Sequence, residues 1–343
     1  MRTSHKLPQW LFSFALFILL SASATLAARA ADPGIPFPFS AASSDQKAGS
    51  LLVYNVYTSG AINFTHQNAR LGLTNTSDFI DVAIHLFFVD GATCSVADSY
   101  VCLTANQTIN FLASDLDPGV TGYLIVLAVN AQGCPIRHNF LIGDLYVKFA
   151  SGHSGNLGAE AFAAQYEAFT GCSSSSTTAT LVFDTSGVAN SYNPLPRTVA
   201  ADNIPDISSN NNTMLIVNRI GGNLATGVST LGAIAGILYD DGENGFSFTF
   251  TSGACQFRST LSNVFPRTAP RFETIIPSGR SGWMKLYADS PAAGLLGATI
   301  NHNSNSTTTA NAFNGARNLH HLTYNNSGGG SVGLTIPVFP PGC

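Results

Sequence analysis

Charged side chains are scarce in this chain of 343 residues. Asp, Glu, Lys and Arg together make up only 10% of the residues, against about a quarter in ordinary globular proteins. The few Lys and Arg residues are scattered along the chain. A surface that follows nucleic-acid phosphates needs clustered cations, so the sequence argues against nucleic acid as a partner.

Sequence signatures of catalysis and cofactor binding are also missing. The chain has no G-x-S-x-G elbow, no glycine pattern of a phosphate-binding or dinucleotide-binding loop, and no C-x-x-C pair. Cys134 and His138 have the spacing of zinc ligands, but no second pair completes a zinc site. We therefore expect no catalytic centre, no cofactor and no metal, and a protein that is not an enzyme.

Long apolar runs are confined to the start of the chain. Residues 1–30 have the pattern of a secretory signal peptide: Arg2 and Lys6 precede an apolar segment at 10–20, and Ala28 and Ala30 mark a cleavage site. An uncleaved anchor is the alternative, although the apolar segment is short for a membrane span. Removal of these residues leaves 12 Lys and Arg against 19 Asp and Glu, a net charge of −7. We expect a secreted or cell-surface protein without membrane contact after cleavage.

What the chain does contain is a series of short apolar segments separated by turn residues. The stretch from Asp78 to Asp144 shows this best, with apolar runs at 82–89 and 123–129. The run at 82–89 is apolar on both faces, which indicates a central strand, and its His85 is expected to be packed and hydrogen-bonded. Turns such as Asp117-Pro118-Gly119 recur about every dozen residues, which is typical of an antiparallel sandwich.

The length predicts two domains. We predict an all-β fold of two tandem immunoglobulin-like antiparallel β-sandwich domains, at residues 48–150 and 213–340. Residues 31–47 are predicted as a linker. Residues 151–212 are predicted as a connecting segment, in which 156–169 is either a short helix or an ordered loop.

The two halves resemble a distant duplication. Residues 117–123 (DPGVTGY) and 276–283 (IPSGRSGW) each carry a proline turn, a glycine and an aromatic residue before an apolar run. The apolar strand that ends at Asp90-Gly91 is similarly matched by one that ends at 238–242. Chance recurrence of common turn residues is the alternative explanation.

An even number of cysteines in an exported chain predicts disulfides. All six are candidates: Cys94, Cys102, Cys134, Cys172, Cys255 and Cys343. The sequence cannot decide the pairing. We expect Cys94–Cys102 because the intervening residues can form a closed loop, followed by Cys134–Cys172 and Cys255–Cys343 within the two domains.

Two acidic turns are the remaining candidate sites. Asp240, Asp241 and Glu243 are weak calcium candidates, since the ligand-spaced loop of a calcium site is absent, and a solvated hairpin tip is the alternative. Asp115 and Asp117 flank a turn, where capping of the turn is the simpler explanation.

Several motifs together resemble a family of exported bacterial proteins that has no characterised activity. They are HLFFVDG (85–91), the C-x7-C pair (94 and 102), LTANQT (103–108), DLDPG (115–119), GCPI (133–136), FLIGD (140–144) and GRSGWMKL (279–286). The resemblance implies two β-sandwich domains outside the cell and carries over no catalytic residue.

These observations favour a secreted or cell-surface protein with a structural, adhesive or interaction role. Its expected partner is an extracellular protein or a glycan surface, and the oligomeric state stays open. The first alternative is a carbohydrate-binding protein, because the loops are rich in Asn and a few aromatic residues could stack on sugar rings. A secreted hydrolase that uses Asp115, Asp117, Asp241 and Glu243 is the second alternative.

Overall fold

A computed structural model of the chain describes residues 43–63, 65–184, 188–288, 290, 293–305, 312–322 and 331–343. The predicted signal peptide at 1–30 and residues 31–42 of the predicted linker lie outside the described residues. No helix in the described ranges is both long enough and apolar enough to cross a membrane.

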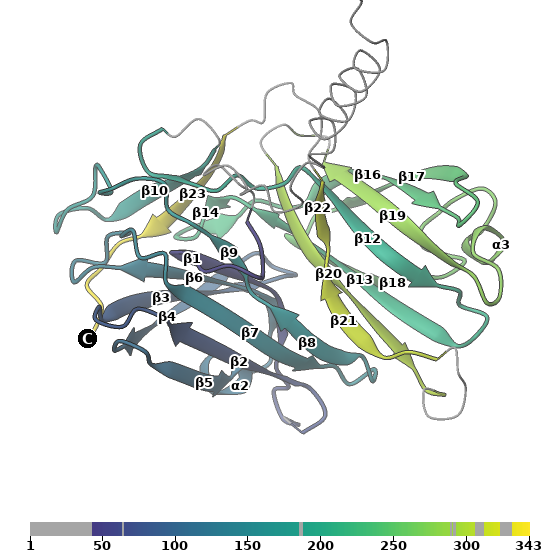
Figure 1. Ribbon diagram of the computed structural model, residues 1–343, viewed down its shortest axis with the longest axis horizontal. Helices are drawn as coiled ribbons and strands as arrows, with labels where there is room; N and C mark the ends of the chain where they lie inside the picture. The colour runs from purple at the N-terminus through teal and green to yellow at the C-terminus, as the bar shows by residue number, and fades with distance from the viewer. Residues whose placement is uncertain are drawn as a thin grey trace, which may run out of the picture. The chain divides into compact units, whose positions relative to one another are not determined.

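The described residues form a nearly all-β structure of five sheets (Figure 1). Sheet A has the order β4 (Val96–Leu103), β3 (Val82–Asp90), β6 (Thr121–Val129), β1 (Leu51–Thr58) and β9 (Glu160–Phe162). Sheet B has the order β5 (Thr108–Leu112), β2 (Asn68–Asn75), β7 (Leu141–Lys148) and β8 (Ser154–Gly158). Sheet C has the order β11 (Ser191–Tyr192), β10 (Thr178–Phe183), β23 (Val332–Pro337), β14 (Gly222–Asn223) and β15 (Gly227–Val228).

The later part of the chain forms the two remaining sheets. Sheet D has the order β17 (Gly245–Ser252), β16 (Gly232–Tyr239), β19 (Ser281–Ala288), β12 (Thr198–Pro205) and β22 (His320–Leu322). Sheet E has the order β18 (Gln256–Thr260), β13 (Asn211–Ile220), β20 (Gly294–Asn303) and β21 (Gly315–Asn318). The pairings are antiparallel except for β10 with β11 and β14 with β23.

Sheets A and B have the same connectivity as sheets D and E. We call residues 51–162 the first repeat and residues 198–322, without the β14–β15 excursion, the second repeat. Each repeat places its strands in the same order. Each also has a one-turn helix between its fifth and sixth strands: α2 (Ala113–Leu116) between β5 and β6, and α3 (Phe272–Ile275) between β18 and β19. This arrangement agrees with the duplication predicted from the two proline turns.

The repeats agree even in an irregularity. The pairing of β1 with β6 shifts register between Tyr54 and Tyr57, and that of β12 with β19 shifts between Ala201 and Ile204. Beyond the shift, Tyr57 faces Gly122 just as Ile204 faces Gly282. Register is normally set by which face of a strand is buried, so a bulge kept at the same place fixes which residues of the two repeats are equivalent.

Three apolar clusters hold the sheets together. One lies between sheets A and B, one between the other face of A and sheet C, and one between D and E. On β3, Ile84 and Leu86 belong to the first cluster, whereas Phe87 and Val89 belong to the second. Because side chains alternate along a strand, burial on both faces explains the unbroken apolar run and confirms β3 as a central strand.

Sheet E is also buried on both faces. Ile216 and Ile300, on its outer face, belong to the same cluster as Leu52 of the first repeat. The buried side chain of Asn218 donates a hydrogen bond to the carbonyl oxygen of Asn55 at 2.7 Å. The described residues from 43 to 343 therefore pack as one compact unit.

The segment expected to connect two domains contributes strands instead. Residues 154–158 form β8 and residues 160–162 form β9. The structure therefore has strands in a region where the sequence predicted either a short helix or an ordered loop. Leu157 pairs with Leu145 on β7, and Phe162 pairs with Leu51 on β1. The backbone groups of this segment thus complete the edges of sheets A and B. The second repeat correspondingly begins at Thr198, before the predicted boundary at 213.

Two disulfides are present, and they correct two of the three expected pairings. Cys134 bonds to Cys172, as predicted, but Cys102 bonds to Cys343. The Cys94–Cys102 pairing is wrong because the chain between them runs extended as β4, and six residues of strand span about 20 Å. The Cys255–Cys343 pairing is wrong because Cys343 is already bonded to Cys102; Cys94 and Cys255 are free and buried.

Candidate functional site

Two of the three acidic residues proposed as calcium candidates are engaged by neighbouring protein groups. The Asp240 carboxylate accepts hydrogen bonds from the Gly242 and Asn244 amides at 2.9 and 2.8 Å. Asp241 forms an ion pair with Arg280, and Glu243 is exposed. Hydrogen bonds from Asn244 lower the pKa of Asp240, and the bond from Arg280 lowers the pKa of Asp241. Among the described residues, no group of three or more His, Cys, Asp or Glu side chains could hold a metal ion.

Asp115 and Asp117 stabilise the end of β5 and the turn after it. Asp115 accepts a hydrogen bond from the Leu112 amide at 3.4 Å, and Asp117 accepts one from the Tyr57 hydroxyl at 2.5 Å. Burial raises the pKa of Asp117, although the bond from Tyr57 opposes that shift. These two carboxylates belong to the first repeat, whereas Asp241 and Glu243 belong to the second. Asp115, Asp117 and Asp241 each interact with a different partner. The structure therefore offers no support for a hydrolytic pair among them.

His85 is packed and hydrogen-bonded, as the sequence predicted. It is fully buried, its Nε2 lies 2.8 Å from Asp98 Oδ2, and its ring stacks on Tyr100 with centroids 4.1 Å apart. Burial lowers its pKa to about 4, against the opposing effect of Asp98. Because the ring is enclosed and neutral at pH 7, we assign it a structural role.

A second enclosed group joins the edge strands β9 and β22. His321 Nε2 lies 3.6 Å from Glu160 Oε1, and His321 Nδ1 lies 3.4 Å from Ser43 Oγ. This order of serine, histidine and carboxylate is that of a nucleophile with its base. Burial, however, raises the pKa of Glu160 to about 8, with a further contribution from Asp45, and burial lowers the pKa of His321 to about 4. A carboxyl group that is neutral at pH 7 cannot stabilise an imidazolium, so the arrangement lacks the charge that such a base requires.

The candidate site is instead a polar pocket at one end of the second repeat. The inward face of β20 begins with Leu295 and Gly297 and continues with Thr299, Asn301 and Asn303. By alternation, the side chains of the four residues other than Gly297 point toward sheet D. The interior of this repeat therefore changes from apolar to polar along a single strand.

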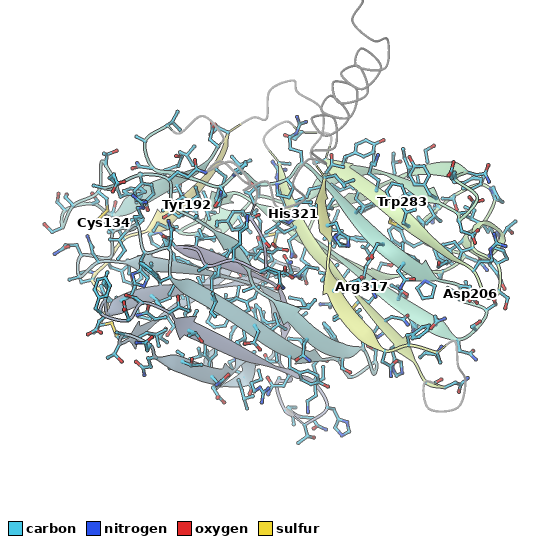
Figure 2. All side chains as sticks on the ribbon, in the orientation of Figure 1. Cys134, Tyr192, Asp206, Trp283, Arg317 and His321 are labelled. Carbon is cyan, nitrogen blue, oxygen red and sulfur yellow. A yellow bond between two sulfur atoms is a disulfide. The ribbon has the colours of Figure 1, made fainter. Side chains whose placement is uncertain are left out.

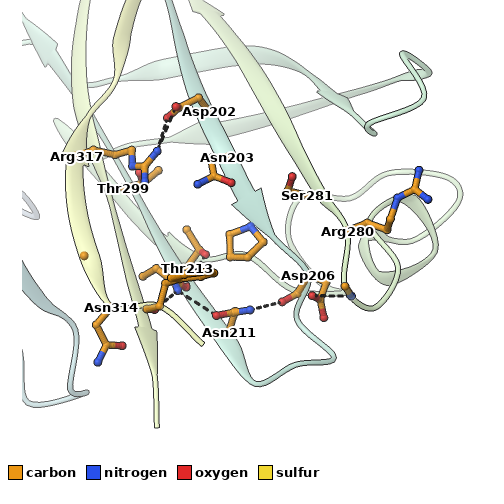
Figure 3. A pocket seen from close by; sticks show the side chains of 15 residues that line it. Asp202, Asn203, Asp206, Asn211, Thr213, Arg280, Ser281, Thr299, Asn314 and Arg317 are labelled. Carbon is orange, nitrogen blue, oxygen red and sulfur yellow. Dashed lines mark hydrogen bonds and ion pairs between the residues drawn. The ribbon is translucent and has the colours of Figure 1, made fainter. Parts of the chain in front are cut away.

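The space beside these polar residues is a cavity of about 380 Å³ (Figure 3). Its walls come from β12, β13, β20 and β21 and from the loop before β19. The residues that line it are Asp202, Asn203, Pro205, Asp206, Asn211, Thr213, Gly279, Arg280, Ser281, Thr299, Asn301, Phe313, Asn314, Gly315 and Arg317. Figure 3 shows Asn211 and Thr213 on one side of the cavity, and Asp202 and Arg317 at another.

A chain of amide hydrogen bonds holds the wall formed by sheet E. Thr213 Oγ1 donates to Asn301 Oδ1 at 2.9 Å, and Asn301 Nδ2 donates to Asn211 Oδ1 at 3.1 Å. Asn303 Nδ2 donates to the same Asn211 oxygen at 2.9 Å. Each side chain is thereby fixed in orientation, which reduces the entropy that a ligand would have to remove.

The charged groups of the pocket are also held in place. Arg317 on β21 reaches across to Asp202 on β12, with its Nη1 3.1 Å from Asp202 Oδ2 (Figure 3). Asp206 accepts hydrogen bonds from the Ser209 and Gly279 amides at 2.7 and 3.0 Å. Burial opposes the ionisation of Asp206, but these bonds and those from the serine hydroxyls outweigh it and lower its pKa. Asp206 is therefore a carboxylate at neutral pH.

Chemically, the pocket offers amide, hydroxyl, carboxylate and guanidinium groups together with one exposed aromatic ring. Phe313 is 62% exposed at the rim. The described residues that line the pocket include no histidine and no cysteine. Such a set can donate and accept many hydrogen bonds, but it brings no nucleophile together with a base.

Sequence reasoning missed this pocket. A signal was present in ATINHN (298–303), where Thr299, Asn301 and Asn303 alternate with Ala298 and Ile300. The pattern is that of a strand with one wet face. It could not show that the wet face points into the sandwich, because the apolar residues on the opposite face are covered by the first repeat.

Two aromatic residues that could have stacked on sugar rings lie away from the pocket. Trp283 is half-buried on the outer face of sheet D, where its ring stacks on Tyr239 at 4.3 Å (Figure 2). Tyr123 is fully buried, and its hydroxyl donates to the carbonyl oxygen of Arg219 at 3.1 Å. Neither ring lines the polar pocket.

Comparison of the chain with protein-family models, with curated proteins and with solved structures finds no match to any of them.

Proposed function

We propose that this protein is an exported, non-catalytic binding protein whose second repeat holds a small polyhydroxylated ligand, such as a sugar unit of a glycan, in the polar pocket. In this proposal the two repeats are tandem immunoglobulin-like sandwiches, and the partner is a glycan surface outside the cell. The observation that carries it is the polar inward face of β20, at positions where a sandwich normally places apolar residues.

The chemistry of the walls supports this ligand class. Sugar hydroxyls both donate and accept hydrogen bonds, and the Asn, Asp and Arg side chains of the pocket provide both functions in planar groups. Phe313 offers an apolar surface for the carbon face of a ring. The volume of about 380 Å³ lies within the range of small-molecule sites, about 300–1,000 Å³.

The two disulfides support export. The structure has the disulfides Cys102–Cys343 and Cys134–Cys172. Disulfides persist in oxidising compartments and are rare in cytosolic proteins. Together with the signal-like residues 1–30, they favour a secreted or cell-surface location.

The test is a glycan array probed with the exported protein, followed by calorimetric titration of the glycans that bind. Variant Thr299→Leu/Asn301→Val gives the pocket the apolar residues that the first repeat has at the equivalent positions, and we expect it to lose at least tenfold in affinity. Thr249→Val, on an exposed position of β17, is the matched control and should bind as the wild type does.

Two results would contradict the proposal. An array without any bound glycan would remove the carbohydrate ligand and leave a structural or adhesive role at the surface. Unchanged binding by the folded double variant would show that the glycan binds elsewhere on the molecule.

A further inference from the structure

Two cysteines outside the disulfides lie at the junction of the two repeats. Cys94 is in the turn between β3 and β4, and Cys255 is in the turn between β17 and β18. They are 7% and 0% exposed and belong to the same apolar cluster. Each repeat therefore contributes one buried thiol to the same region.

Both residues converge on one carbonyl group. Cys255 Sγ lies 3.2 Å from the carbonyl oxygen of Asp90, and the backbone amide of Cys94 donates to that oxygen at 2.9 Å. Cys255 Sγ also lies 3.5 Å from the carbonyl oxygen of Gly91, in the same turn as Cys94. Burial, together with Cys94, raises the pKa of Cys255 well above its ordinary value.

The backbone around the thiols is fixed from both sides. The Gln256 amide donates to the carbonyl oxygen of Gly91 at 3.1 Å, and the Val228 amide donates to that of Cys94 at 3.2 Å. The second repeat and the β14–β15 excursion thus each hold the β3–β4 turn by a main-chain hydrogen bond, one at Gly91 and one at Cys94. The two cysteines are thus held against the same carbonyl group before any bond forms, and a disulfide requires such proximity.

The duplicated turn of the second repeat provides a comparison. Cys94 has φ 62°, and Glu243, at the equivalent place between β16 and β17, has φ 67°. This left-handed region favours Gly or Asn. Glu243 is exposed, whereas the cysteine is enclosed against the other repeat. The first repeat therefore places a thiol at a position where backbone conformation alone would favour glycine.

We propose that Cys94 and Cys255 are joined by a third disulfide in the exported protein, which links the first repeat covalently to the second. The oxidant is a disulfide donor of the export compartment, either a thiol–disulfide oxidoreductase or a small-molecule disulfide. One cysteine thiolate attacks the donor disulfide and releases one donor thiol. The second cysteine then attacks the mixed disulfide, forms the new S–S bond and releases the second donor thiol.

This exchange balances. The two cysteines lose two protons and two electrons, and the donor disulfide is reduced to two thiols. Because a buried thiol with a raised pKa is a poor nucleophile, the exchange takes place while the second repeat is still docking onto the turn. The proposal does not depend on the pocket or on its ligand.

The direct test is a disulfide map of the full chain secreted into an oxidising compartment. The protein is denatured, alkylated without reductant, digested and analysed by mass spectrometry. We expect no alkylated cysteine, a linked peptide pair that contains Cys94 and Cys255, and an intact mass about six hydrogens below that of the reduced chain. Alkylation of both cysteines, with the other two disulfides intact, would overturn the proposal.

Variants give a second, independent readout. If the pair is bonded, Cys94→Ala, Cys255→Ala and the double variant remove the same cross-link and should lower Tm by similar amounts, several degrees each. If the thiols are only packed, the double variant should lower Tm clearly more than either single variant, even with coupling between neighbours, and that result would contradict the proposal. Should a variant fail to fold, the wild-type map still decides.

Discussion

The two repeats share their strands but differ in what fills them. The register shift that the two repeats share makes Tyr54 equivalent to Ala201. The pairing of β7 with β2 and of β20 with β13 makes Leu145 equivalent to Thr299, and Val147 equivalent to Asn301. In the first repeat these positions are fully buried, and the Tyr54 hydroxyl donates to the carbonyl oxygen of Gly72 at 2.6 Å. In the second repeat the residues at these positions are smaller or polar, and the space that they do not fill is the pocket.

This difference separates two uses of one architecture. The first repeat has an apolar cluster on each face of sheet A, because sheets B and C cover it. The second repeat keeps an apolar interior only over part of its length and is polar at one end. In the proposed function, the first repeat serves mainly as a packing unit and the ligand binds only to the second.

The largest expected effect on stability comes from replacing Tyr54 of the first repeat with alanine, the residue at the equivalent position of the second repeat. Tyr54→Ala removes a fully buried ring, and we expect it to lower the free energy of unfolding by about 4 kcal/mol. Urea unfolding measures the loss. Ala201→Gly in the second repeat is the control, with an expected loss near 1 kcal/mol. Equal losses would show that the two interiors are packed alike.

Exchange of one polar position should sharpen the contrast. Val147→Asn places an amide in a fully apolar environment, and we expect a loss of about 3 kcal/mol. Asn301→Val removes hydrogen bonds from a partly exposed site and should cost about 1 kcal/mol. Urea unfolding of both variants checks the order, and a larger loss for Asn301→Val would mean that the pocket residues hold the fold together.

The buried carboxyl group of Glu160 predicts that the stability of the fold depends on pH. Glu160 on β9 has a pKa raised to about 8, above its ordinary 4.5, so the folded state holds a proton that the unfolded state has released. Stability from this group is complete below pH 4.5 and is lost as pH rises toward 8, by about 1 kcal/mol per pH unit.

The neighbouring histidine acts in the opposite direction. The pKa of His321, lowered to about 4 from 6.5, gives stability that is present above pH 6.5 and is lost as pH falls toward 4. Unfolding of wild type and of Glu160→Gln at pH 5, 6.5 and 8 isolates the carboxyl group. We expect the wild type to lose stability relative to the variant at each step, whereas a constant difference would show that Glu160 does not change its protonation.

The smallest effect is expected in the duplicated hairpin turns. Glu243→Gly relieves a left-handed residue in an exposed turn and should raise the free energy of unfolding by up to about 1 kcal/mol. Cys94→Gly has nearly the same φ but loses a buried side chain, so it should be destabilising. Thermal unfolding compares them, and a gain in both would show that the Cys94 side chain contributes nothing.

Local patterns were sufficient to predict strands and turns. The apolar run at 82–89, the turn at 117–119 and the similarity of 117–123 to 276–283 all derive from backbone chemistry that acts over a few residues. The Cys134–Cys172 bond was also predicted correctly. The family resemblance, the secreted location and the ligand class stay predictions.

Long-range pairings account for what the sequence could not show. The Cys102–Cys343 bond joins residues far apart in the chain, and nothing local distinguishes Cys343 from the other candidates. The pocket likewise depends on which face of β20 the first repeat covers, because Ile300 is packed against the first repeat and Asn301 points the opposite way. Alternation identifies the two faces of a strand but not the neighbour of each.

Sheet C has a consequence for the order of folding. Its strand β10 precedes the second repeat, its β14–β15 hairpin leaves from within that repeat, and β23 follows it. The part of the apolar face of sheet A that β23 covers therefore stays open to water until synthesis has passed through β23. A chaperone that binds such an open face during synthesis would shield the nascent protein from aggregation until the last strand arrives.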